Sequence, residues 1–515
     1  MQLDGYIASQ EGAVDLHIDR ESPVSLYLQI SGGIKQLILA GHLPDGFLLP
    51  PERRLADSLG VNRTTVVNAY QQLKTDGFVD ARVGRGTMVL PRRPKDPEGK
   101  AAQPLAWRQL AREGAAREPD PLVRDLLALT ERRDVISMAV GLPAPEMLPL
   151  DAMGRIHARL LAERGAEVFL HSPTEGVTAF RDAICRHMVS RGIQCTVPEV
   201  LVTSGSQQAL DLVARAYLAP GDVVVVEEPS YFGALETFRA AQARLMGVPA
   251  DGDGMRTDLL ENLLARQRPK LIYTLPTFQN PSGSVLSLER RRRLLELAYR
   301  YQVPVVEDDP YSDLRYEGQT VPSLKALDPS GYVVYLSSFS KILFPGLRLG
   351  WIAAPRPVIR QLALTKQSVD LHSNTLGQWM VERFITEGLF SRHLEASRTE
   401  YARRRDAMIE ALEAEAAEGF TWNRPQGGFY VWCTFPETVS PSALMQEAAQ
   451  EHVAFLPGGA SFVGDPGQNH IRLNFTYCEP ARIREGIARL MRAYRAVAAK
   501  PRSAERLQGG TPPIV

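Results

Sequence analysis

The sequence predicts a multidomain protein with two folded parts: a small, mainly α-helical domain with a β-wing near the N-terminus, and a large α/β body. Three observations support this prediction. Short helix signals separated by turn signals fill residues 20–90. Residues 91–134 include RRPKDPEGKAAQP near their start, which lacks apolar periodicity and is typical of a linker. From Val135 onward, apolar strand-like runs alternate with helical stretches, which is the pattern of an α/β domain.

Composition excludes several classes of protein. A chain of 515 residues can bury a large core without disulfides or a structural metal. Its 59 Lys and Arg balance 59 Asp and Glu, so any basic surface for nucleic acid must be local. The four cysteines are scattered and form no metal-ligand spacing, which favours a reducing compartment and argues against a zinc site: Cys185, Cys195, Cys433 and Cys478.

The chain carries no targeting or membrane signal that we recognise. The first twenty residues contain acidic side chains and lack an apolar run of signal-peptide type. No run of 18 or more apolar residues occurs, so no membrane span is expected. We therefore expect a cytoplasmic protein with a small domain at 20–90, a linker at 91–134, a large body at 135–498 and a disordered tail at 499–515.

The small domain begins with a helix in SLYLQISGGIKQLILAG. Its apolar residues Ile30, Ile34, Leu37 and Ile38 recur at helical spacing, and Gly41 provides a stop signal. This helix would bury one face against the segments that follow it in the chain.

Two further helices and a hairpin follow. In PPERRLADSLG, Pro51 suits a first helical turn and Gly60 suits a helix end. Asn62 can then cap a helix in RTTVVNAYQQLKTDG. Two helices joined by so short a turn form a helix-turn-helix. FVDARVGRGTMVL predicts two short strands around a glycine-containing tip, which is the expected wing.

Positive charge is concentrated in this domain. Residues 53–95 contain nine Lys and Arg but three Asp and Glu, a local excess in a chain that is neutral overall. A solvated basic face would explain the charge alone. The ordered succession of helix, turn, capped helix and wing instead favours contacts to DNA phosphates.

The segment PPERRLADSLGVNRTTVVNAYQQLKTDGFVDARVGRGTMV resembles the GntR-type winged helix. The resemblance implies double-stranded DNA as a partner, with contacts from Arg53, Arg63 and Thr64 and with Gly84 at a wing tip in the minor groove. Arg63 and Thr64 also begin the second helix of the motif, the end that meets base edges and phosphates.

In the large body, the segment SSFSK ends at Lys341, between the apolar run YVVYL and ILFPGLRLGW. A carbonyl cofactor requires a deprotonatable amine to form a Schiff base, and a cofactor phosphate requires hydroxyls and a guanidinium. Lys341 would supply the amine, and Ser338 and Arg348 the phosphate contacts. A lone lysine after a strand would otherwise be a solvated surface residue.

Other polar residues also follow apolar strands, where α/β proteins place their ligands. In VPVVEDDPYSDL, a carboxylate can hold a pyridine nitrogen protonated. We assign this role to Asp308, partly on the family pattern described below, while Asp309 suits a turn or helix cap. In TLPTFQNPSG, Asn280 can donate to a phenolate oxygen, and Tyr311 could be a second donor.

Three more segments complete the candidate site. VLVTSGSQQALDLVARAYL predicts a strand, a glycine turn and a helix, so that the N–H groups of Gly205, Ser206 and Gln207 would point at a phosphate. EEPSYFG offers Tyr231 for ring stacking. In IRLNFT, Arg472 could bind an amino-acid carboxylate or form a structural salt bridge.

The order and approximate spacing of these residues over 135–495 resemble the fold-type I aminotransferases. The resemblance also covers GLPAPEMLP, SPTEGVTAFRDAI and PQGGFYVW. It implies pyridoxal 5'-phosphate as the cofactor, a homodimer with sites at the subunit interface, and Gly141 beside the bound substrate. This chain has HSPTEG where relatives commonly have YGPTEG, so His171 replaces a tyrosine that usually reaches the partner subunit's cofactor phosphate.

The combination of a GntR-type winged helix with an aminotransferase-like body resembles the MocR-type regulators. The resemblance implies a transcription factor in which Lys341 holds the cofactor as an internal aldimine and a small amino compound displaces it as an external aldimine. That exchange would change the spacing of two winged helices over promoter half-sites. Two alternatives stay open: a working aminotransferase with a secondary DNA-binding domain, and a sensor of the cofactor itself.

Overall fold

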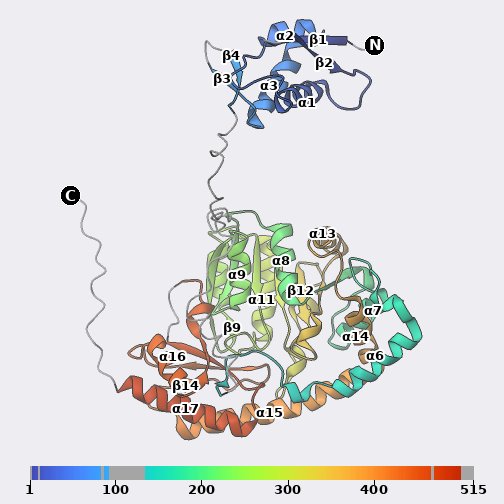
Figure 1. Cartoon of the computed structure of the whole chain (residues 1–515). Helices are drawn as coiled ribbons and strands as arrows, with labels where there is room; N and C mark the ends of the chain where they lie inside the picture. Colours follow the sequence, from blue (N-terminus) through green and yellow to red (C-terminus); the bar gives the residue numbers. More distant parts are fainter. Residues whose placement is uncertain (1–2, 10–11, 83–85, 92–133, 465–468, 500–515) are drawn as a thin grey trace, which may run out of the picture. The chain divides into compact units, whose positions relative to one another are not determined.

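The computed structural model describes residues 3–9, 12–82, 86–91, 134–464 and 469–499. The chain divides into two compact units, Met1–Leu110 and Ala111–Val515 (Figure 1). Nearly all of the predicted linker at 91–134 and of the predicted tail at 499–515 lies outside the described residues, as does Gly84.

The N-terminal unit confirms the predicted winged helix-turn-helix. Helices α1 (Leu26–Leu39), α2 (Glu52–Ser58) and α3 (Arg63–Thr75) are followed by the antiparallel strands β3 (Val79–Arg82) and β4 (Gly86–Val89). Their apolar faces meet in one core, which includes Ile30, Ile34, Leu55, Val66, Leu73, Val79 and Val89.

Short-range interactions set the ends of these helices. The side chain of Asn62 accepts a hydrogen bond from the backbone N–H of Thr64 at 3.1 Å and thereby caps α3. Gly41 follows α1 and Gly60 follows α2, with φ of +83° and +61°. Glycine adopts these positive φ values freely, whereas a residue with a Cβ adopts them only at a cost in free energy.

An additional hairpin precedes the predicted boundary at residue 20. Strands β1 (Leu3–Ser9) and β2 (Gly12–Ile18) pair antiparallel, and Leu16 and Ile18 are buried in the core of the helical unit. The alternation of Val14, Leu16 and Ile18 is the period-two signal of a strand, but it spans too few residues to stand out in the sequence.

A mixed eight-stranded sheet forms the centre of the C-terminal unit and confirms the predicted α/β body. Neighbouring strands pair in parallel except at β13, which is antiparallel to both neighbours, and at β9. Their order across the sheet is β6 (Val200–Thr203), β13 (Gly350–Ala353), β12 (Val333–Ser338), β11 (Val305–Asp308), β10 (Leu271–Thr274), β7 (Val223–Glu228), β8 (Arg244–Asp251) and β9 (Gly254–Met255).

Helices cover both faces of this sheet because successive strand residues point to opposite sides. On β10, for example, Tyr273 packs in the cluster with α8 (Ser206–Tyr217), α9 (Phe232–Ala240) and α13 (Arg356–Gln367). Ile272 packs on the other face, with α10 and α11. The helices of that second face are α7 (Thr178–Ser190), α10 (Thr257–Leu264), α11 (Leu288–Tyr301), α12 (Leu324–Leu327) and α14 (Thr375–Thr386).

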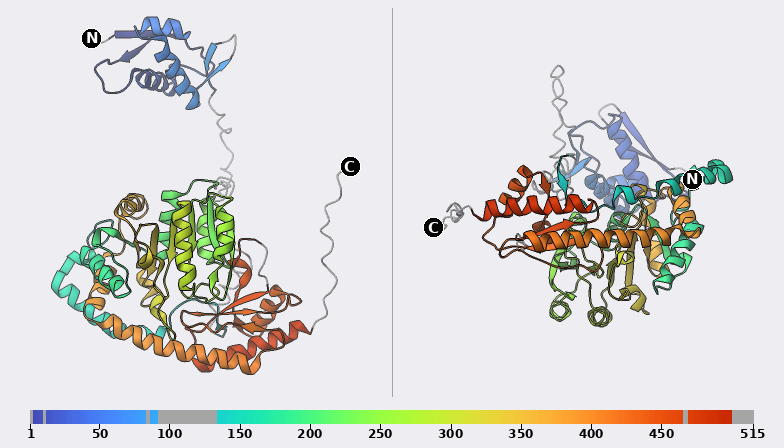
Figure 2. Two further views of the ribbon diagram at one scale, coloured as in Figure 1. Left: turned by 180° about the vertical axis from the view of Figure 1, so that it is seen from behind. Right: turned by 90° about the horizontal axis from the view of Figure 1, so that it is seen from below.

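A smaller antiparallel sheet lies against the large one and completes the α+β part of the body. Long helices α15 and α17 run side by side below it (Figures 1 and 2). Its strands are β14 (Thr421–Trp422), β15 (Tyr430–Thr434), β18 (His470–Asn474) and β17 (Leu456–Pro457). Nearby lie α15 (Leu389–Glu415), α16 (Pro441–Gln450), α17 (Pro480–Ala498) and the short parallel pair β5 (Ile136–Ser137) and β16 (Val453–Ala454). Helix α6 (Leu150–Arg164) packs against α14.

Among the described residues, no helix is both long enough and apolar enough to cross a lipid bilayer.

Candidate functional site

A cavity of about 380 Å³ opens where the carboxyl ends of the central strands meet the smaller sheet. Switch points of this kind in α/β proteins hold ligands. Nine of the residues that the sequence singles out line it: Gly141, Ser206, Tyr231, Asn280, Asp308, Tyr311, Ser338, Lys341 and Arg472.

Three further predicted residues lie beside the cavity without lining it: Gly205, Gln207 and Arg348. Gly205 precedes α8 with φ of +90°, and a Cβ at this position would be 2.7 Å from Nη2 of Arg348. The glycine therefore allows the arginine to lie against the turn that begins α8. Gln207 uses its side chain elsewhere, donating from Nε2 to Oγ1 of Thr237 at 2.7 Å.

Lys341 follows β12 and reaches into the cavity. Its Nζ donates to the carbonyl oxygen of Gly141 at 2.6 Å. Burial lowers the pKa of Lys341 below its usual range, which makes the neutral, nucleophilic amine more accessible.

Asp308 is the last residue of β11 and points to the face that carries α8 and α9. Tyr273 donates its hydroxyl to Oδ2 of Asp308 at 2.9 Å. Oδ1 is buried and has no hydrogen-bond partner among the described residues. Burial raises the pKa of Asp308 to about 7, and the hydrogen bond from Tyr273 opposes that rise. This carboxylate therefore has one oxygen fixed and one available to a donor in the cavity.

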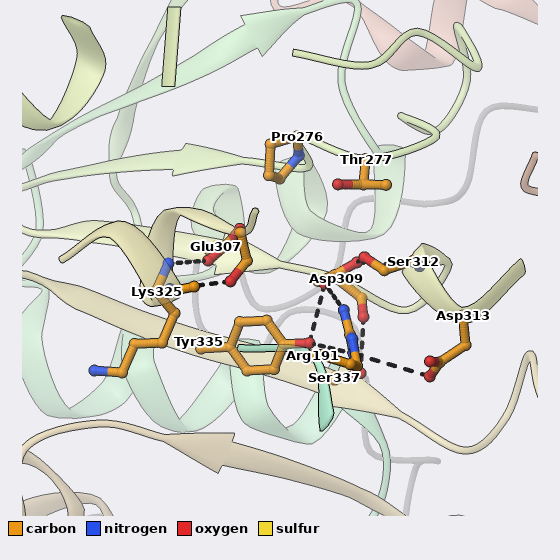
Figure 3. A network of polar contacts seen from close by, with 12 residues as sticks. Arg191, Pro276, Thr277, Glu307, Asp309, Ser312, Asp313, Lys325, Tyr335 and Ser337 are labelled. Carbon is orange, nitrogen blue, oxygen red and sulfur yellow. Dashed lines mark hydrogen bonds and ion pairs between the residues drawn. The ribbon is translucent and has the colours of Figure 1, made fainter. Parts of the chain in front are cut away.

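Asp309, the neighbouring carboxylate, does not line the cavity and lies in a polar network with Arg191, Ser312 and Tyr335 (Figure 3). It pairs with the guanidinium of Arg191 and accepts from the hydroxyl of Tyr335 at 3.0 Å. Arg191 also approaches Asp313 at 3.8 Å. Because successive strand residues alternate, Asp308 and Asp309 have different partners, and the partners of Asp309 are those of a structural ion pair.

The turn before α8 and the loop after β12 form a cluster of hydrogen-bond donors. Arg348 donates from Nη2 to the carbonyl oxygen of Ser204 at 3.0 Å and from Nη1 to Oγ of Ser340 at 3.4 Å. The hydroxyl of Ser338 lies 3.0 Å from that of Ser340. A guanidinium, hydroxyls and the N-terminus of a 12-residue helix together suit a phosphate group.

Arg472 reaches the cavity from β18. It donates from Nη1 to Oδ1 of Asn280 at 2.8 Å and from Nη2 to the carbonyl oxygen of Ala139 at 2.7 Å, while its buried Nε has no partner among the described residues. No carboxylate of the described residues pairs with it. The structural salt bridge considered as an alternative is therefore absent from this part of the chain.

Tyr430 on β15 lines the cavity and was not singled out by the sequence analysis, although PQGGFYVW contains it. Its hydroxyl lies 3.1 Å from that of Tyr311, and a Cβ on Gly141 would be 2.2 Å from the same oxygen. Burial would raise the pKa of Tyr430, but the positive charges of Arg472 and Lys341 lower it overall. The other lining residues that the sequence did not reveal are Ala139, Val140, Leu142, Phe232, Leu275, Pro310, Ser340 and Leu456.

His171 lies outside the cavity lining, on an exposed surface. Its Nδ1 is 2.7 Å from Nε2 of His372, so one ring donates a hydrogen bond to the other. The reach of His171 toward a partner subunit's phosphate stays a prediction.

The N-terminal unit exposes the three described residues predicted to contact DNA: Arg53, Arg63 and Thr64. Arg63 forms an ion pair with Glu52 of α2 at 3.0 Å, and 67% of its side chain is exposed. Gly84 lies outside the described residues.

The cavity fits a pyridoxal phosphate group by the chemistry of its donors and acceptors. The unpartnered Oδ1 of Asp308 can accept from a protonated ring nitrogen, and Lys341 offers an amine to an aldehyde. The donors at the start of α8 match a phosphate.

Comparison with known proteins gives the same two parts. Residues 133–490 match the family described as aminotransferase class I and II, and residues 26–89 match the gntR family of bacterial regulatory proteins.

The relatives include both enzymes and regulators. Aromatic-amino-acid aminotransferase 1 of Thermococcus litoralis is 44% identical over 374 residues, covering 72% of this chain and 90% of that protein. The probable rhizopine catabolism regulatory protein MocR of Rhizobium meliloti is 31% identical over 488 residues, covering 94% of this chain and 96% of that protein. The crystal structure of LysN, an α-aminoadipate aminotransferase of Thermus thermophilus bound to N-(5'-phosphopyridoxyl)-L-leucine, is 38% identical, with a TM-score of 0.72 over 77% of this chain and 100% of that one.

Proposed function

The chain belongs to the class I and II aminotransferase family and carries an N-terminal GntR-family domain, and we propose that it is a pyridoxal-phosphate-dependent, DNA-binding transcriptional regulator that responds to a small amino compound. One observation carries this proposal: a winged helix and a cavity that holds a buried lysine amine occur in the same chain. A relative that matches the chain over 94% of its length is named as a regulatory protein, which supports the same conclusion.

In this proposal the cavity holds the cofactor through groups of this chain. When bound, pyridoxal phosphate supplies an aldehyde that reacts with primary amines and a ring that withdraws electrons. Lys341 provides the amine that anchors it, and Asp308 accepts a hydrogen bond from the ring nitrogen. The remaining contacts are Asn280 and Tyr311 to the phenolic oxygen, Tyr231 to the ring face, and Gly205, Ser206, Gln207, Ser338 and Arg348 to the phosphate.

The effector would be an amino compound with a carboxylate. Arg472 offers the guanidinium for that carboxylate, and its unpartnered Nε supports this role. Gly141 would lie beside the bound compound, because it lines the cavity next to Lys341. An incoming amine would release Lys341, whose Nζ could then hold or transfer a proton.

The response of DNA binding follows from linkage. A ligand shifts an equilibrium between conformations only by its difference in affinity for them. We infer a homodimer in which the amine favours one spacing of two winged helices over two half-sites of double-stranded DNA. Arg53, Arg63 and Thr64 would then make the contacts to base edges and phosphates.

A direct test measures DNA affinity and cofactor absorbance on the same full-length protein. The protein loaded with pyridoxal phosphate is titrated with the standard α-amino acids while binding to labelled DNA from upstream of its own gene is followed. We expect at least one amino acid to change both signals, and Lys341→Ala to bind DNA without either response. An unchanged DNA affinity across the panel, with a clear absorbance change, would contradict the regulatory function.

A working aminotransferase is the second candidate, favoured by the 44% identity to the aromatic-amino-acid enzyme and by the presence of Lys341 and Asp308 in the cavity. Single-turnover conversion of the bound cofactor to its amine form, followed by the steady-state rate with a 2-oxo acid, distinguishes the two. Rapid turnover without sequence-specific DNA binding would select the enzyme. A change in DNA affinity on adding cofactor alone would instead select a sensor of the cofactor.

A further inference from the structure

We propose that Tyr273 is a positioning residue that fixes the direction of the Asp308 carboxylate, so that its Oδ1 faces the ring nitrogen of the cofactor. The inference rests on the proposed role of Asp308 and extends it to a residue outside the cavity lining. Tyr273 lies on β10, directly opposite Val306 of β11, and therefore on the same face as Asp308 two residues further along.

The Tyr273 hydroxyl leaves Asp308 one free oxygen. A tyrosine hydroxyl has a single proton to donate, and here it goes to Oδ2 of Asp308 at 2.9 Å. Oδ1 is also buried, lacks a partner among the described residues, and belongs to a residue that lines the cavity. A buried oxygen of this kind is costly unless a donor reaches it. A protonated ring nitrogen is such a donor.

The Tyr273 side chain is itself held in place. It is fully buried, and its ring packs edge-to-face against Phe238 of α9, with ring centroids 5.6 Å apart. A partial rotation of the Asp308 carboxyl group about Cβ–Cγ would break the bond to Tyr273, so the fixed hydroxyl selects one plane for the carboxyl group and leaves one oxygen facing the cavity.

The hydrogen bond from Tyr273 also affects the protonation state of Asp308. Burial and the neighbouring Asp309 favour the protonated acid, whereas Tyr273 and Lys341 favour the carboxylate. Only the carboxylate keeps both oxygens as acceptors, and a protonated acid could not hold the ring nitrogen in its charged form. Tyr273 thus supports both the direction and the charge of the acceptor.

Tyr335 provides a matched control. It is a fully buried tyrosine on β12, and its hydroxyl donates to Oδ2 of Asp309 at 3.0 Å (Figure 3). Neither Tyr335 nor Asp309 lines the cavity. Removing its hydroxyl breaks the same kind of Tyr–Asp bond one residue along the chain, together with a hydrogen bond that Arg191 donates to this hydroxyl at 2.8 Å, without touching Asp308.

The experiment compares two cofactors in three proteins. Pyridoxal phosphate and 1-deazapyridoxal phosphate, in which carbon replaces the ring nitrogen, are titrated into cofactor-free wild type, Tyr273→Phe and Tyr335→Phe, and binding is followed by absorbance. We expect wild type and Tyr335→Phe to prefer pyridoxal phosphate. Tyr273→Phe should lose roughly tenfold in affinity for pyridoxal phosphate and little for the deaza compound, since one hydrogen bond to a charged group is involved.

Two results would overturn the inference. An equal loss for both compounds in Tyr273→Phe would make Tyr273 a packing residue only, leaving the role of Asp308 intact. Equal affinity of wild type for both compounds would show that Asp308 does not bind the ring nitrogen. Neither result decides whether amines change DNA binding, so failure of the regulatory function stays distinguishable. If Tyr273→Phe does not fold, Tyr273→Met, which also lacks the donor, is used with the same affinity ratio as readout.

Discussion

The guanidinium of Arg472 lies over the ring of Tyr430, with its Cζ 4.0 Å from the ring centroid. The two residues come from the neighbouring strands β18 and β15, and Tyr430 also meets the hydroxyl of Tyr311 at 3.1 Å. The side chain of Tyr430 therefore contacts both Arg472, which we propose binds the effector's carboxylate, and Tyr311, which we propose donates to the cofactor's phenolic oxygen. A desolvated cation–π contact is worth about 2 kcal/mol.

Tyr430→Leu should weaken binding of an amino-acid effector by about tenfold, because Arg472 loses the face that supports it. Binding of the matching amine without a carboxylate should change much less. Spectral titration of the cofactor-loaded protein with each pair of compounds measures both constants. Tyr430→Phe keeps the ring and serves as the control. Equal losses for the acid and the amine would show that Tyr430 shapes the cavity without supporting Arg472.

The fold could be predicted well where local signals and function coincide. The capping residue Asn62, the stop glycines Gly41 and Gly60 and the wing strands are all short-range features, and the structure contains each one. Lys341 and Asp308 could also be predicted from the sequence, because α/β proteins place ligands at strand ends and the chemistry requires an amine and a carboxylate.

The residues that support the site could not be predicted from the sequence, and the reason is physical. Tyr273 reads as an apolar strand residue in LIYT, and its bond to Asp308 depends on the pairing of β10 with β11. Tyr430 reaches the cavity only because the smaller sheet packs against the large one. Arg191 is separated from Asp309 by more than a hundred residues. Such contacts arise from tertiary packing, which a single sequence does not display.

Asp308 and Glu307 should each contribute less to the stability of the cofactor-free protein as the pH rises from about 4 to about 7. Burial raises the pKa of both Asp308 and Glu307 to about 7, whereas an unfolded carboxyl titrates near pH 4. In this window the folded state binds more protons, so ionisation on raising the pH favours unfolding.

The contribution of Asp308 can be isolated by comparison with Asp308→Asn. We expect the free energy of unfolding of this variant to fall less steeply over the window, by up to about 1.4 kcal/mol per pH unit for one proton. Urea denaturation of both proteins at pH 5 and pH 7 gives the difference. Parallel profiles would contradict a raised pKa. Asp182→Asn, on the exposed side of α7, controls for the substitution itself.

Arg63→Ala should weaken specific DNA binding by about 1–3 kcal/mol and leave the cofactor spectrum unchanged. Arg63 is exposed at the start of α3, the end that enters a groove in helix-turn-helix proteins. Fluorescence anisotropy with specific and scrambled DNA separates the loss of specificity from a general loss of phosphate contacts. An equal reduction on both DNAs would assign Arg63 to phosphate binding alone.

Glu52→Gln tests the ion pair that holds Arg63 in the free protein at 3.0 Å. Exposed pairs of this kind contribute between about 0 and 1 kcal/mol to stability, so the melting temperature should hardly move. Removing the carboxylate also removes a negative charge near DNA phosphates, so non-specific affinity should rise while discrimination between the two DNAs falls. Unchanged discrimination would show that Glu52 does not orient Arg63.

Arg191→Met should destabilise the C-terminal unit by about 3–5 kcal/mol, because it leaves the buried carboxylate of Asp309 without its cation. Asp309 is fully buried and Arg191 nearly so, which prevents water from replacing the lost pair. Arg186→Met on α7 is the matched control, since its ion pair with Asp182 is exposed and should contribute about 0.5 kcal/mol or less. Urea denaturation of both variants gives the comparison. Similar losses in the two proteins would mean that the hydrogen bonds from Tyr335 and Ser312 satisfy Asp309 without the guanidinium of Arg191.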